Sequence, residues 1–179
     1  VKNGVVLFIE VKTSRGRLSE HQERFRDELV QAGGNYLVAR SVEQVEQALG
    51  GRPVRYVHAT EYADGLSASL KAGIAAVPPE CAAAVVCLGD MPLVTGRMID
   101  RLLSMYDPDE GRLIVMPTFR GKQGNPMLWD RRFFPEILAI SGDSGARFLV
   151  GKYAESVVEV EMADDAVLRE IAQGVVGAA

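Results

Sequence analysis

The sequence contains few of the residues that build disulfide frameworks and transition-metal sites. Among 179 residues there are only two cysteines, two histidines and one tryptophan. Cys81 and Cys87 have neither a Cys-x-x-Cys spacing nor a Cys/His spacing, which argues against a zinc site. We therefore expect the two cysteines to be small buried residues in a reducing compartment.

The sequence also lacks long apolar runs and an excess of basic charge. No apolar stretch approaches the length of a membrane span, and the N-terminus does not resemble a secretion signal. The formal net charge is -4, which disfavours nonspecific binding of polyphosphate. We expect a cytoplasmic protein with no membrane partner.

Segments with strand-like and helix-like patterns alternate along the chain. Apolar runs of strand length occupy 5–9, 36–39, 54–58, 82–88, 113–116, 126–129 and 157–160. Helical patterns lie between them: from 20 to the Gly33-Gly34 stop, and over 42–49, 67–76, 96–106, 133–139, 144–150 and 165–173. Ser19, Ser41 and Thr95 stand where helix N-caps are expected. This alternation predicts one α/β domain over 1–179, with a three-layer, Rossmann-like and mostly parallel sheet.

Ligands of such sheets bind beyond the carboxyl ends of the strands. Asp90 comes directly after the apolar strand 82–88 and precedes Met91-Pro92. A carboxylate at this position can hold a divalent metal ion that bridges substrate phosphates. The alternative is a turn aspartate that hydrogen-bonds its own backbone. Two segments with glycine, 62–70 and 121–126, would let a ligand approach the backbone closely.

Four motifs, in this order, resemble the molybdenum-cofactor cytidylyl- and guanylyltransferases over about 54–160. They are Tyr-x-x-Gly-Leu-Ser-x-Ser-Leu at 62–70, Gly-Asp-Met-Pro at 89–92, Gly-x-x-Gly-Asn-Pro at 121–126 and Gly-Asp-x-Gly-Ala-Arg at 142–147. The resemblance implies the nucleotide-diphosphosugar-transferase architecture. It also implies magnesium-dependent transfer from a nucleoside triphosphate to a pterin-type substrate, molybdopterin.

The resemblance further implies roles for particular residues. The aspartate of the second motif binds magnesium beside the nucleotide phosphates in that family, which points to Asp90. The implied substrate-binding residues are Gly65, Ser67 and Ser69 near the base and ribose, and Gly124, Asn125 and Pro126 beside the pterin-type substrate. For the fourth motif, with Asp143, Gly145 and Arg147, the resemblance gives no clear role.

The sequence departs from that family at both ends. The family's first strand leads into a glycine-rich loop and a lysine that cradle the triphosphate, whereas 7–16 reads LFIEVKTSRG. The family's usual Asp-Ile-Asp-Thr-Pro-like segment is replaced by VLREI at 167–171. Because nucleotidyl transfer depends on positioning phosphates and neutralising their charge, an active and an inactive transferase both remain open.

Residues 3–49 resemble a second family, the VRR-NUC nucleases. Glu10 and Lys12 alternate on a predicted strand, so both side chains point to the same face. In such nucleases the carboxylate holds magnesium and the lysine activates the attacking water. The resemblance also implies Gln22 at this site. It supports an alternative function, a nuclease module acting on nucleic acid, with Glu10 as metal ligand and Lys12 as catalytic residue.

The two resemblances meet near residue 50. They predict a single domain composed of a nuclease-like segment, 1–50, and a transferase-like segment, 51–179. Its origin would be a natural recombination or an engineered chimera. If Glu10 and Asp90 meet in one cleft, they would share one metal ion. A third hypothesis is a catalytically silent chimera, which has neither activity.

Overall fold

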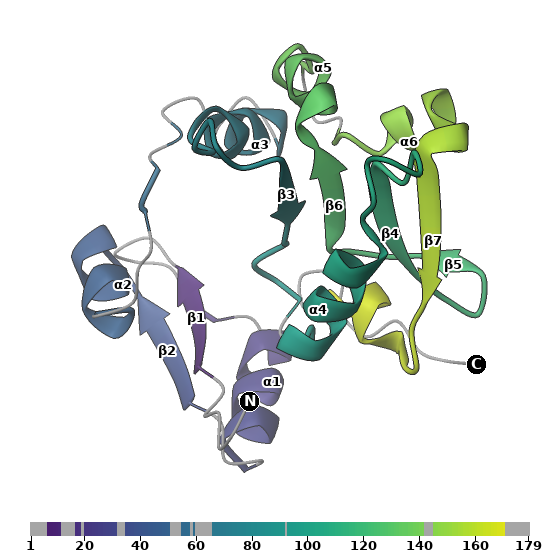
Figure 1. The fold of residues 1–179 in the computed structure, drawn as a ribbon. Coiled ribbons are helices and arrows are strands. Elements are labelled where there is room, and N and C mark those ends of the chain that lie inside the picture. The colour runs from purple at the N-terminus through teal and green to yellow at the C-terminus, as the bar shows by residue number, and fades with distance from the viewer. Residues whose placement is uncertain are drawn as a thin grey trace. The chain divides into compact units, whose positions relative to one another are not determined.

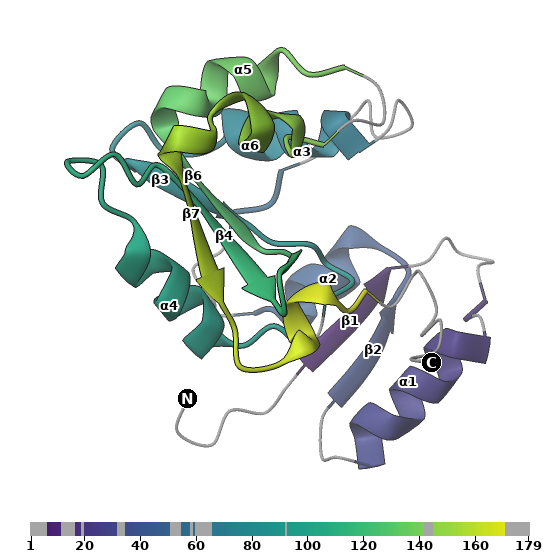
Figure 2. The same cartoon turned by 90° about the vertical axis from the view of Figure 1, so that its right-hand side faces the viewer.

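A computed structural model describes residues 7–11, 17–18, 20–31, 35–50, 55–57, 59, 66–91, 93–141 and 145–170. The chain divides into two compact units, shown in Figures 1 and 2. The first contains Val1–Arg55 with Glu170–Ala179, and the second contains Tyr56–Arg169. Both combine strands with helices, so the protein is a mixed α/β protein, as the alternating pattern predicts.

The first unit is a strand–helix–strand crossover followed by a helix (Figure 1). β1 (Leu7–Val11) pairs in parallel with β2 (Asn35–Ala39), and α1 (Glu20–Gln31) connects them. Parallel neighbours need such a long connection, because a tight turn can only reverse the chain. α2 (Val42–Ala48) begins as predicted, with the Ser41 hydroxyl accepting the Gln44 N–H at 3.4 Å.

The second unit is built on a five-stranded sheet in which β4 (Ile114–Phe119) has three partners. β6 (Met127–Asp130) runs antiparallel between β4 and β3 (Ala83–Val86), and β5 (Lys122–Gln123) also runs antiparallel to β4. β7 (Val157–Glu161) is parallel to β4. The sheet is therefore mixed, and the prediction of a mostly parallel sheet is wrong for this unit.

A tight turn at Arg120-Gly121 is the physical reason for this difference. Both residues have a positive φ, 50° and 74°, which matches the twist of a two-residue β-hairpin. Short connections of this kind join antiparallel strands, so the chain reverses after β4 into β5 and then β6. The sequence pattern identified the strand near 126–129 and interpreted 121–126 as a loop, without its reversal.

Helices pack on both faces of this sheet (Figure 2). Alternate residues of β4 face opposite sides: Met116 belongs to one apolar cluster and Val115 to the other. The first cluster includes residues of α3 (Leu66–Ala75), α5 (Phe134–Leu138) and α6 (Phe148–Lys152). The second includes residues of α4 (Gly96–Met105) and of the 3₁₀ helix η4 (Asp165–Leu168). Two further 3₁₀ turns, η2 (Arg131–Phe133) and η3 (Ala154–Ser156), precede α5 and β7.

Several predicted elements are corrected. Residues 55–57, inside the predicted strand 54–58, are not in a strand. The predicted helix 165–173 is only the short η4, after which 169–170 are irregular and 171–173 lie outside the described residues. Cys87 is exposed and Cys81 is half-buried, so the prediction of buried cysteines is wrong. In the described part of the chain, no helix is long and apolar enough to cross a membrane.

Candidate functional site

The Asp90 turn lies directly beyond the carboxyl end of β3. The chain leaves the strand through Cys87 and Leu88, and the Met91 N–H donates to the Leu88 carbonyl at 3.4 Å. Met91 is 5% exposed and anchors the turn in the apolar core. No described residue hydrogen-bonds or pairs with the half-buried Asp90 carboxylate. Among the described residues its oxygens thus have no partner, and the alternative of a self-bonded turn aspartate gains no support.

A groove of about 420 Å³ separates α3 from β3 and adjoins this turn. Ser69 of the first motif and Gly89 of the second both line it, among mainly apolar side chains. Ser67 is only 2% exposed and points into the protein interior, whereas Ser69 is exposed. Of the predicted base- and ribose-binding residues, Ser69 is thus the one on the groove, and Gly65 lies outside the described residues.

The third motif forms a tightly held loop between β5 and β6. The Gly124 N–H donates to the Pro117 carbonyl at 2.8 Å, and the Asn125 N–H donates to the Val167 carbonyl at 2.9 Å. The approach to Val167 requires glycine, because a Cβ on Gly124 would lie 2.3 Å from the Val167 oxygen. Pro126 follows through a cis peptide bond and is buried. Gly124 and Pro126 therefore shape the loop, and Asn125 supplies its polar side chain.

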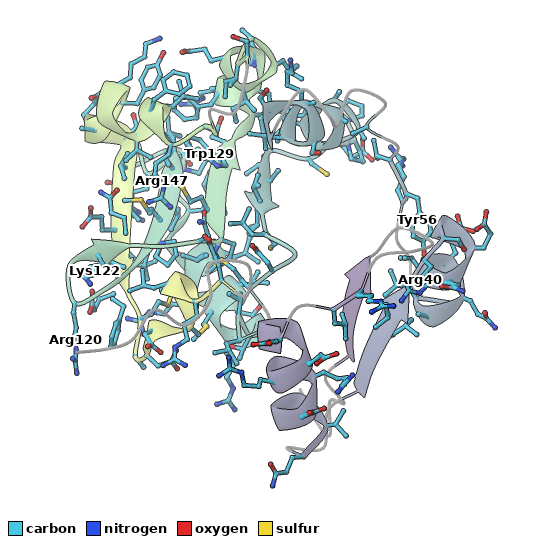
Figure 3. All side chains as sticks on the ribbon, turned by 180° about the vertical axis from the view of Figure 1, so that it is seen from behind. Arg40, Tyr56, Arg120, Lys122, Trp129 and Arg147 are labelled. Atoms are coloured by element: carbon cyan, nitrogen blue, oxygen red, sulfur yellow. The ribbon has the colours of Figure 1, made fainter. Side chains whose placement is uncertain are left out.

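The fourth motif contacts the third through Arg147. Its two terminal guanidinium nitrogens donate to consecutive carbonyls, those of Gln123 at 3.4 Å and Gly124 at 3.2 Å. Figure 3 shows Arg147 near Trp129, on the same part of the second unit. No role was predicted for this arginine, because its partners are backbone carbonyls 23 and 24 residues away along the chain. Asp143 lies outside the described residues.

A second pocket, of about 140 Å³, brings the motifs together. Leu70 comes from the first motif, Leu88 immediately precedes the second, Asn125 belongs to the third and Arg147 to the fourth. The full lining is Leu70, Val86, Leu88, Asn125, Met127, Trp129, Gly145, Ala146 and Arg147. Leu70, Val86 and Leu88 also line the larger groove, so the two cavities adjoin.

Trp129 is a pocket residue that none of the four sequence motifs contains. It is 2% exposed, belongs to the apolar cluster under α5, and still lines the smaller pocket. A position facing both core and cavity carries no sequence signal of its own. Because Trp129 is the only tryptophan of the protein, its emission reports on this pocket.

Other carboxylates of the second unit are engaged in structural contacts. Buried Asp130 accepts the Tyr106 hydroxyl at 2.6 Å and caps η2. Burial, followed by this hydrogen bond, raises the pKa of Tyr106 to about 12. Glu161 accepts the Arg120 N–H at 2.7 Å and the Thr118 hydroxyl at 2.8 Å, which lower its pKa. Asp90 differs from these groups in having no described partner.

Asp90 is the predicted metal ligand whose side chain the structure describes. Within the described ranges, no three His, Cys, Asp or Glu side chains gather closely enough to hold a metal ion. Glu10 lies in β1, but its side chain is outside what the structure describes, as is that of Gln22 in α1; Lys12 is outside the described residues altogether. A metal ion shared by Glu10 and Asp90 therefore stays a prediction.

The second unit has the layout of α/β proteins that bind ligands beyond their strand ends: the Asp90 turn follows β3, and two adjoining cavities lie beside it. Residues 21–157 match the family model described as the MobA-like NTP transferase domain, and the chain belongs to this family. The match includes α1, β2 and α2, which the nuclease resemblance claimed, and it spans the predicted junction near residue 50. These elements are therefore part of the transferase domain.

Solved structures with a similar fold come from bacteria. Rv0371c from Mycobacterium tuberculosis H37Rv is 23% identical, with 89% of each chain covered and a TM-score of 0.53. The structure of Rv0371c in complex with manganese is 22% identical, with 87% of each chain covered and a TM-score of 0.52. The protein Aq1419 from Aquifex aeolicus VF5 is 12% identical, with 93% of this chain and 92% of that chain covered, and a TM-score of 0.50. These likenesses show a shared fold. No curated protein matches the sequence.

Proposed function

We propose that this protein is a metal-dependent, cytoplasmic nucleotidyltransferase of molybdenum-cofactor biosynthesis. It transfers a nucleotide from CTP or GTP to a pterin-type acceptor, molybdopterin, and magnesium is the expected ion. The observation that carries the proposal is the convergence of the four motifs on two adjoining cavities of one unit. The family match supports the class of reaction and its nucleoside triphosphate substrate.

Asp90 is the proposed metal ligand. A hard divalent cation such as Mg²⁺ is bound by oxygen, commonly through one or two carboxylates together with substrate phosphates. The Asp90 carboxylate at the end of β3, which has no partner among the described residues, fits this donor set, and Glu10 is the proposed second carboxylate. The bound ion would neutralise the phosphates between which the P–O bond breaks.

The remaining residues divide between the two substrates. Ser69 and Gly89 line the larger groove, which we assign to the nucleotide. Gly65 and Ser67 stay predicted nucleotide-binding residues of the same motif. Asn125 lines the smaller pocket, which we assign to the pterin-type acceptor, with Gly124 and Pro126 holding the loop. Because the cavities adjoin, an acceptor oxygen in one can reach a phosphate of a nucleotide in the other.

Calorimetric titration of CTP and GTP, in magnesium and in manganese, tests this proposal. We expect metal-dependent binding that Asp90→Ala weakens by at least about tenfold, since even outer partners of metal ligands contribute that much. Asp100→Ala, which removes an exposed carboxylate of α4, is the matched control and should bind like the wild type. Absence of binding at millimolar nucleotide would reject the proposal and favour a catalytically silent protein.

The nuclease hypothesis stays a prediction with its own test. It uses Glu10, Lys12 and Gln22, whose side chains lie outside what the structure describes. If it holds, the protein cleaves plasmid DNA in magnesium or manganese, and Lys12→Ala abolishes the cleavage. Plasmid that stays intact after prolonged incubation would reject it.

A further inference from the structure

Arg147 of the fourth motif hydrogen-bonds the backbone of the third motif. Two guanidinium nitrogens of Arg147 donate to the Gln123 and Gly124 carbonyls, at 3.4 and 3.2 Å. Arginine suits this task because its planar fork has several donors in a fixed geometry. Arg147 stands at the N-terminus of α6, so the contact ties that helix to the loop between β5 and β6.

The same loop is held from two other elements. β4 accepts the Gly124 N–H through Pro117, and η4 accepts the Asn125 N–H through Val167. With the Arg147 contacts, the Gln123 carbonyl, both backbone groups of Gly124 and the Asn125 N–H are each hydrogen-bonded. The side-chain amide of Asn125 is different: no described residue hydrogen-bonds it, and Asn125 lines the pocket together with Trp129. In the described part of the chain, the loop backbone is thus held while the Asn125 amide has no partner.

We propose that Arg147 is a positioning residue for the acceptor substrate, an inference that rests on the proposed function. Through the two carbonyls it fixes the loop in the orientation in which Asn125 presents its amide to the pocket. A carboxamide offers two N–H donors and a carbonyl acceptor, and it recognises a ligand edge with the complementary pattern only when held in place. Arg147 thus acts on binding through Asn125, and its own nitrogens stay on the loop.

Amide hydrogen exchange tests, without any ligand, whether Arg147 holds the loop between β5 and β6. Arg147→Ala should raise the exchange rates of the Gly124 and Asn125 amides by about tenfold or more. Arg147→Lys, which keeps the charge but loses the fork, should give an intermediate rise. Arg97→Ala, removing an exposed arginine in the first turn of α4, should change neither amide. In all variants the amides that pair β4 with β7 serve as an internal reference. Unchanged exchange at Gly124 and Asn125 in Arg147→Ala would overturn the proposal, whether or not the protein is a transferase.

A double-mutant cycle then tests the route through Asn125. Binding of neopterin, a soluble pterin, is followed by Trp129 emission. Arg147→Ala and Asn125→Ala should each weaken it by about tenfold, and the double variant should lose no more than Asn125→Ala alone. Affinity for CTP and GTP should stay unchanged in Arg147→Ala. Additive losses would show that Arg147 contacts the ligand itself and would overturn the proposal. If wild type binds no nucleotide, the transferase function is rejected. The exchange rates of the Gly124 and Asn125 amides then still test whether Arg147 holds the loop.

Discussion

Gly124 shows how one missing side chain shapes the proposed acceptor site. A methyl group there would lie 2.3 Å from the backbone oxygen of Val167, which cannot move away as a flexible side chain could. We therefore expect Gly124→Ala to lower the free energy of unfolding by about 1–3 kcal/mol, the usual cost of overpacking. Urea unfolding followed by Trp129 emission measures this change.

Gly151 is the matched control for that substitution. It lies in α6 and nothing would stand within 4 Å of an added Cβ. Alanine is the better helix former, so Gly151→Ala should stabilise the protein by up to about 1 kcal/mol. A Gly124→Ala variant as stable as wild type would contradict the close approach to Val167.

Tyr106 gives the protein an alkaline pH dependence. Burial and the hydrogen bond to Asp130 raise its pKa from 10.0 to about 12, so between these values the folded state holds a proton that the unfolded state has lost. The stabilisation is complete below about pH 10 and is lost as the pH rises toward 12. The unfolding free energy of wild type should thus fall more steeply over this range than that of Tyr106→Phe. Parallel slopes in urea titrations of the two proteins would contradict this account.

Among the elements, α4 depends on its N-cap. The Thr95 hydroxyl accepts the Met98 N–H at 3.4 Å, and the helix buries Leu102 completely. Thr95→Ala should cost about 1 kcal/mol, while Thr95→Ser, which keeps the acceptor, should cost little. Thermal unfolding followed by circular dichroism measures both. Equal losses in the two variants would show that the hydroxyl does not stabilise the helix.

The elements that the sequence predicted are those with local signals. β3 is a continuous apolar run, and α2 and α4 each begin after a capping hydroxyl. The hairpin after β4 was missed because its turn uses Arg120 at a positive φ, where asparagine or aspartate before glycine is the usual signal. The segment after Asp164 has helical residues, but its described part, 165–170, forms one 3₁₀ turn, η4. The Val167 carbonyl of this turn accepts the Asn125 N–H instead of an N–H of a following helical turn.

In the candidate site too, the sequence predicted only the residues that have a local signal. Asp90 was identified by its place after a strand, and the structure leaves its carboxylate without a described partner. Ser67 looked equivalent to Ser69, yet burial separates them, and burial depends on how α3 rotates against the core. The hydrogen bonds from Arg147 to the third motif are tertiary contacts, which no local sequence pattern predicts.

At the scale of the whole molecule, we propose that residues 1–179 form one three-layer Rossmann-like domain, as the sequence predicts. The family match over 21–157 takes in residues of both compact units, which supports this proposal. A single cooperative domain unfolds in one transition that all probes follow. Trp129 emission, which reports on the second unit, should therefore follow the same urea transition as the far-ultraviolet circular dichroism of all helices. Two separate transitions would show independent domains.

The central claim is that Asp90 binds the metal ion of a nucleotide complex at the end of β3. Mn²⁺ tests it most directly, because this paramagnetic ion broadens the NMR signals of nearby amides. In the presence of CTP or GTP, substoichiometric Mn²⁺ should first broaden the amides of Gly89, Asp90 and Met91, and Asp90→Asn should remove the effect. Broadening centred elsewhere, or the same broadening in Asp90→Asn, would contradict the claim.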